Sequence, residues 1–102
     1  MELNELRNVI DGIDGQLVDL FVKRMDVAAQ IAQYKKENNL PIYVPARERE
    51  KLQDVADKAG QNMANYTRVL YSMLFELSRS YQRKRIDDTL IFCFFTRKTK
   101  RL

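Results

Sequence analysis

The stretch that decides the fold is residues 3–38, LNELRNVIDGIDGQLVDLFVKRMDVAAQIAQYKKEN, which contains no proline and no glycine after Gly15. Steps of three and four residues predict a helix with one apolar row, made of Val18, Val22, Met25, Ala29 and Ala32. A second, mixed row contains Leu17, Leu20, Phe21, Arg24, Ala28, Ile31 and Lys35. Arg24 and Lys35 stand eleven residues apart, which is three turns, so both point the same way from an otherwise apolar face. Cations in such a row are costly unless an anion meets them, and this predicts an anion site.

The length of this helix predicts a partner. About 35 residues at 1.5 Å each give roughly 50 Å, whereas a compact domain of about 100 residues has a radius of gyration near 13 Å. Two apolar rows are also more than one neighbour can cover, so we expect a second copy packed along the helix. The alternative is a helix that bends or breaks at Gly12 or Gly15.

Two further helices are expected. Pro41 ends the first helix, Ile42 to Val44 form an extended connection, and Pro45 opens a second helix that stops at Gly60. Asn62 or Asn65 caps a third helix that reaches about Arg85. The apolar run Leu90–Phe95 predicts a strand or an aggregation-prone tail. The expected organisation is therefore an all-α domain over residues 1–86 (one long, one short and one medium helix) and a tail of unknown role over residues 87–102.

Composition removes several classes of function. The 102 residues carry a formal net charge of +4, much of it at the C-terminal end, and contain no histidine and one cysteine. Histidine chemistry, multi-cysteine metal sites and an intrachain disulfide are thereby excluded. No basic face suggests nucleic acid, and no apolar run is long enough to span a membrane. The acidic start, Met-Glu-Leu-Asn-Glu, does not resemble a signal peptide, so a cytoplasmic protein is expected.

Polar residues that interrupt apolar faces or open the second helix form a candidate site for a small polyanion. They are Arg7, Arg24, Lys35, Arg47, Glu48, Ser78 and Gln82. Arginine binds carboxylates with two parallel hydrogen bonds, and lysine supplies a point charge. Arg7 is four or five turns from Arg24, so it would reach such a site only on the partner chain of an antiparallel dimer. Taken singly, each residue also fits a solvated helix surface, a helix-end charge or a charge run.

The chain from Leu3 to about Gln82 resembles the all-helical chorismate mutases. The similarity lies in five segments in a fixed order: residues 6–14 (LRNVIDGID), 20–25 (LFVKRM), 31–35 (IAQYK), 41–48 (PIYVPARE) and 78–82 (SRSYQ). This resemblance implies three helices per chain, entwined as a homodimer with two active sites between the protomers. It also implies conversion of chorismate to prephenate without a cofactor.

The resemblance implies a role for each candidate residue. Arg24 and the partner's Arg7 would hold the two carboxylates of chorismate, with Ser78 near one of them. Lys35 and Gln82 would hydrogen-bond the ether oxygen of the breaking bond. Glu48 would hold the ring hydroxyl, with Arg47 beside it. The family usually has an aspartate where this chain has Val44.

Two other functions fit the same residues. An isochorismate–pyruvate lyase shares the fold and the cation set. A non-catalytic or regulatory helical dimer would explain Val44 and the unusual C-terminal end. The Arg47-Glu48 pair and Ser78 favour the mutase.

Overall fold

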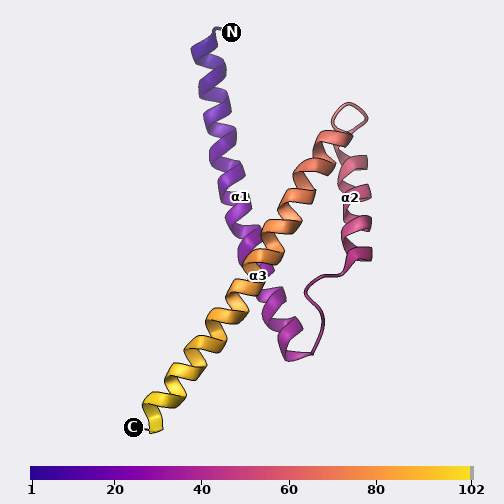
Figure 1. The fold of residues 1–102 in the computed structure, drawn as a ribbon. Helices are drawn as coiled ribbons and strands as arrows, with labels where there is room; N and C mark the ends of the chain where they lie inside the picture. Colours follow the sequence, from indigo (N-terminus) through magenta and orange to yellow (C-terminus); the bar gives the residue numbers. More distant parts are fainter. Residues whose placement is uncertain (102) are drawn as a thin grey trace.

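The computed structural model describes the backbone of residues 1–101 and the side chains of residues 1–86. Its elements are α1 (Leu3–Glu37), α2 (Pro45–Ala59) and α3 (Ala64–Arg101), and the described backbone contains no strand (Figure 1). The all-α prediction with three helices per chain is therefore confirmed. The third helix, expected to be of medium length, has 38 residues and is the longest.

Helix α1 is continuous. A capping box joins Glu2 and Glu5 at its start, where the Glu2 backbone N–H donates to Glu5 Oε2 at 3.2 Å. Gly12 and Gly15 both lie inside the helix, so the alternative of a break at either glycine is wrong. The helix ends before Asn39, whose φ of 55° lies in the left-handed region that asparagine tolerates better than most residues.

Helix α2 has the boundaries that its sequence predicts. Pro45 occupies the first turn, where its missing N–H costs no helical hydrogen bond, and Glu48 adds negative charge at the positive helix end. Gly60 terminates the helix with a φ of +85°, a conformation that glycine adopts without strain. Helix α3 then begins at Ala64, so neither Asn62 nor Asn65 is the residue that precedes it, and the predicted asparagine cap is wrong.

The strand that was one expectation for residues 90–95 is wrong at the level of the backbone, because α3 continues to Arg101. The other expectation, an aggregation-prone tail, stays a prediction. No glycine or proline follows Gly60, so nothing in the sequence interrupts the helical backbone. A short apolar run fits a helix as well as a strand, and the periodicity alone does not separate them. The side chains of residues 87–102 lie outside the described ones, and a separate role for this segment stays a prediction.

The three helices form an open arrangement in which α1 and α3 cross and α2 lies along the first half of α3 (Figure 1). Apolar residues buried within the described part of the chain are few and mostly small: Ala28, Ala32, Val55, Ala56 and Phe75. Ala28 and Ala32 allow the α1 backbone to approach α3 closely. The radius of gyration is 18.8 Å, well above the value of about 13 Å expected for a compact chain of this length.

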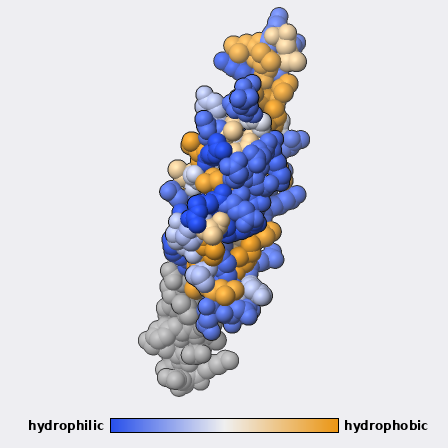
Figure 2. All heavy atoms as spheres, turned by 90° about the vertical axis from the view of Figure 1, so that its right-hand side faces the viewer, coloured by the Kyte–Doolittle hydropathy of each residue, from blue (hydrophilic) through white to orange (hydrophobic). Residues whose placement is uncertain are grey.

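The N-terminal half of α1 projects from the other helices and exposes an apolar seam. We use this name for Leu3, Leu6, Ile10, Ile13, Leu17 and Leu20, whose exposed fractions lie between 47% and 61%. Their spacing alternates between three and four residues, which is the pattern of a helix that packs along another helix. Figure 2 shows hydrophobic side chains along this projecting end at the top of the molecule. No helix among the described residues is long and apolar enough to cross a membrane.

Candidate active site

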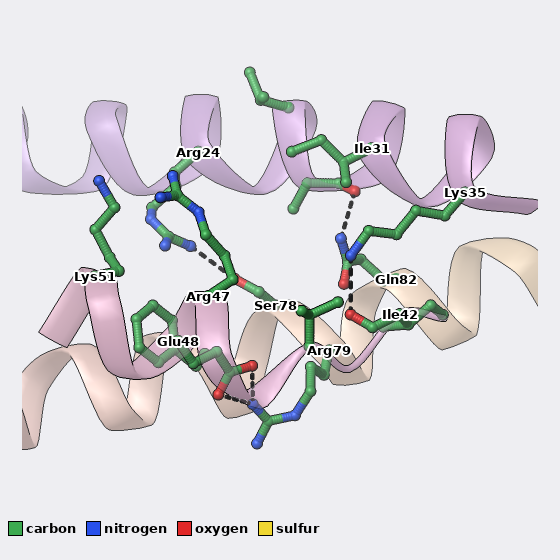
Figure 3. A pocket seen from close by; sticks show the side chains of 14 residues that line it. Arg24, Ile31, Lys35, Ile42, Arg47, Glu48, Lys51, Ser78, Arg79 and Gln82 are labelled. Carbon is green, nitrogen blue, oxygen red and sulfur yellow. Dashed lines mark hydrogen bonds and ion pairs between the residues drawn. The ribbon is translucent and has the colours of Figure 1, made fainter. Parts of the chain in front are cut away.

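A pocket of about 310 Å³ lies where the three helices meet. Helix α1 contributes Arg24 and Lys35, as expected from their spacing of three turns. Six of the seven candidate residues line this pocket: Arg24, Lys35, Arg47, Glu48, Ser78 and Gln82 (Figure 3). The prediction that they share one site therefore agrees with the geometry, although their chemical roles are a separate question.

Arg24 is held in place by α3. Its Nη1 donates a hydrogen bond to Ser78 Oγ at 2.8 Å, and its guanidinium carbon lies 5.8 Å from the ring centre of Tyr71 and 5.9 Å from that of Phe75. Ser78 is itself only 8% exposed, and its hydroxyl faces Met25 Sδ at 3.8 Å. Arg24 is thus ordered before any ligand arrives, and its fork keeps further N–H groups for an anion.

Lys35 and Gln82 lie together at the other end of the pocket in Figure 3. Lys35 Nζ donates to the backbone carbonyl of Ile42 at 3.0 Å, which ties the α1–α2 connection to α1. The amide of Gln82, 6% exposed, donates through Nε2 to the carbonyl of Ala28 at 2.9 Å. An ammonium group has three N–H donors and a side-chain amide has two, so each residue retains donors for a ligand.

Glu48 is paired with a residue that the sequence analysis did not single out. Both of its carboxylate oxygens accept hydrogen bonds from Arg79 Nη1, and Figure 3 draws the two contacts on the α2 side of the pocket. The Arg79 guanidinium also lies 4.7 Å from the ring centre of Tyr43. The hydrogen bond to Glu48 raises the pKa of Arg79 further above its usual range, despite some burial that acts the other way. Arg79 is therefore a permanent cation.

Two charged residues that line the pocket, Lys51 and Arg79, were missed by the sequence analysis. Arg79 directly follows Ser78, and Lys51 stands one helical turn after Arg47, so helical spacing would have found Lys51. Arg47 itself lies at the rim, with a side chain 62% exposed and 3.8 Å from Glu50. Lys51 Nζ lies 3.4 Å from Oδ2 of Asp54, a residue that does not line the pocket. Arg47 is therefore largely solvated, although it also lines the rim of the pocket.

Arg7 is the one candidate that does not line the pocket. It stands seventeen residues before Arg24 on a continuous helix, which places the two Cα atoms about 26 Å apart. An arginine side chain cannot bridge that distance. Any contribution of Arg7 to this kind of site must therefore come from another copy of the chain.

The pocket has a strongly positive lining. Five cationic side chains reach it, from Arg24, Lys35, Arg47, Lys51 and Arg79, against the single carboxylate of Glu48. Val44, which also lines the pocket, adds no charge where the resemblance leads one to expect an aspartate. Apolar residues from α1, from the connection between α1 and α2, and from α3 complete the wall, so the arrangement suits a small anion with an apolar body.

The fold and this pocket define an all-helical protein with a pocket lined mainly by cationic and apolar side chains. The model of the family described as chorismate mutase type II matches residues 6–83, which is most of the chain and includes every candidate residue. The chain therefore belongs to the chorismate mutase type II family.

Several curated relatives are similar to this chain. The T-protein of Haemophilus influenzae is 43% identical over 61 residues, which are 57% of this chain and 16% of that protein. A bifunctional chorismate mutase/prephenate dehydratase of Aquifex aeolicus is 49% identical over 49 residues, 48% of this chain and 14% of that protein. A 4-amino-4-deoxychorismate mutase of Streptomyces venezuelae is 34% identical over 65 residues, 64% of this chain and 59% of that protein.

The chain thus spans only a small part of the length of the first two of these relatives. No solved structure gives a significant match.

Proposed function

We propose that this protein is a chorismate mutase, which rearranges chorismate to prephenate. The observation that carries the proposal is the convergence of Arg24, Lys35 and Gln82 from two helices on one pocket in a chain of this family. The substrate is a dianion with an apolar ring, which matches a cationic pocket with apolar walls. Its rearrangement breaks a C–O bond while a C–C bond forms, and this requires no proton transfer, covalent intermediate or cofactor.

The protein has to hold the substrate in its reactive shape and to stabilise the negative charge that grows on the ether oxygen. Arg24, already oriented by Ser78, would bind one carboxylate and favour the compact shape in which the reacting carbons approach. Lys35 and Gln82 would donate to the ether oxygen, where negative charge grows as the C–O bond breaks. A millionfold acceleration requires about 8 kcal/mol. Orientation and a few kcal/mol from donors already in position are together of that size.

We propose further that the working molecule is a homodimer that places the partner's Arg7 in the pocket. The apolar seam supports this, because six large apolar residues on one helix are unpaired within the chain. The same spacing of three and four continues through Arg24, Val27 and Ile31, which line the pocket. A partner helix lying along the seam therefore runs directly to the site.

The symmetry of such a pair is also constrained. In an antiparallel pair of identical helices, residues that face each other are equally far from the twofold axis. Arg7 of one chain faces Arg24 of the other when the axis passes midway between them, near Gly15. A glycine at that point gives the least steric obstruction to a neighbouring helix, and no atom of this chain lies within 4 Å of a Cβ added there.

The test is incubation of the purified protein with chorismate, followed by loss of ultraviolet absorbance and chromatographic detection of prephenate. Release of pyruvate from isochorismate, with chorismate left intact, would instead identify the protein as a lyase. A folded dimer without activity on either compound would leave the non-catalytic alternative. Sedimentation of the same sample tests the dimer separately. The cytoplasmic location expected from the sequence stays a prediction.

A further inference from the structure

The ion pair between Glu48 and Arg79 changes what the α2 side of the pocket can recognise. Glu48 is the only carboxylate among the residues that line the pocket. Alone, its negative charge would attract a positively charged group on a ligand. Because Arg79 donates to both oxygens, the pair has no net charge. The side chains are 20% and 23% exposed, so solvent screens this neutralisation only in part.

The neighbouring cations on α2 are paired with carboxylates that do not line this pocket, Arg47 with Glu50 and Lys51 with Asp54. Arg47 and Lys51, one and three residues from Glu48 on α2, line the same pocket, and Val44 at the start of the helix is neutral. Glu76 also raises the pKa of Arg79 by its charge but does not line the pocket. No residue that lines this end of the pocket therefore carries an unpaired negative charge.

The paired carboxylate still accepts hydrogen bonds. An ionised carboxylate offers about four lone-pair positions, and Arg79 uses one on each oxygen. A ligand hydroxyl can donate to one of the remaining positions without adding charge. An ammonium group in the same place would meet Arg79, and no unpaired carboxylate lines the pocket to balance its charge.

We propose that Arg79 is a positioning residue that, through Glu48, makes the protein select a ligand with a ring hydroxyl over the corresponding ring amine. The proposal rests on the proposed function, in which Glu48 holds the ring hydroxyl of chorismate. The contrasting compound is 4-amino-4-deoxychorismate, in which an amino group replaces that hydroxyl. A primary amine of this kind is largely protonated at neutral pH.

The test compares kcat/KM for the two compounds in four proteins. Arg79→Gln removes the charge, Arg79→Lys keeps it, and Arg83→Gln removes an exposed arginine one turn further along α3 that does not line the pocket. The unmodified protein should prefer chorismate. Arg79→Gln should shift the preference toward the amine by about tenfold or more, since one unit charge about 4 Å away changes an equilibrium by about fivefold in bulk water and by far more near a protein surface. Arg79→Lys and Arg83→Gln should keep the original preference.

The ratio of the two compounds is unaffected by partial misfolding, which lowers both activities equally. Titration calorimetry with 4-amino-4-deoxychorismate gives the same comparison by binding, if turnover is too slow to measure. An unchanged preference in Arg79→Gln overturns this proposal, and so does an equal shift in Arg79→Lys. If the unmodified protein turns over neither compound, the proposed function itself fails and this proposal fails with it.

Discussion

Mixing two inactive variants tests the shared site most directly. Arg7→Ala removes the arginine that we place across the dimer, and Arg24→Ala removes the one within the chain. The two residues are about 26 Å apart on one helix, so they can serve one site only from different protomers. Removing one partner of a desolvated charge pair costs about 3–5 kcal/mol, which is a loss of about two to four orders of magnitude in kcat/KM for each variant alone.

The recovery on mixing follows from symmetry. After unfolding and refolding of an equal mixture, half of the dimers contain one chain of each kind, and one of their two sites has both arginines. The mixture should therefore regain about a quarter of the unmodified activity per protomer, far above either parent. Activity is followed by chorismate absorbance.

A matched control mixes the Arg24→Ala variant with the Lys35→Ala variant in the same way. Both residues line the pocket of their own chain, so every site in every mixed dimer lacks one of them and no recovery is expected. A mixture of the Arg7 and Arg24 variants that stays at the mean of its parents would refute the shared site. Recovery of activity in the control would show that Arg24 and Lys35 of one active site come from different chains.

Three further predictions concern single positions. Lys35→Ala should lower kcat by about 10²–10³-fold, the usual loss when a donor to a developing negative charge is removed, while Lys36→Ala, outside the pocket, keeps normal turnover of chorismate. Leu17→Asp in the apolar seam should convert the dimer to monomers in sedimentation experiments, and a persistent dimer would show that the interface lies elsewhere. Ala32→Leu should destabilise the fold by about 1–3 kcal/mol in urea unfolding because Ala32 is 1% exposed; an unchanged midpoint would mean that α1 and α3 separate readily.

The sequence predicted those parts of the site that depend on position along one helix. Arg24 and Lys35 share a face because eleven residues make three turns, and Ser78 and Gln82 share one because they stand four apart. Both pairs line the pocket. The boundaries of α2 followed in the same way from Pro45 and Gly60.

The parts that the sequence did not predict depend on contacts between helices or on an ambiguous pattern. Arg79 was missed because its partner, Glu48, lies thirty-one residues away on a different helix, and no local spacing indicates that pair. The helical backbone after Arg85 was not predicted, because an apolar run of six residues has no helical period of its own and left a strand or a tail as the alternatives. The placement of the partner's Arg7, which the sequence does predict, depends on a second chain and stays a prediction.

The hydrogen bond from Lys35 to the Ile42 carbonyl has a consequence for turnover. Ordering a free lysine side chain costs up to about 2 kcal/mol of conformational entropy. A lysine that populates many rotamers before binding loses this entropy when it binds a ligand. Here the four-carbon stem already runs along the pocket wall toward the chain connection, so much of that disorder is removed during folding. In the proposed mechanism the ammonium would exchange this carbonyl for the ether oxygen of the ligand, and little further side-chain entropy would be lost on binding.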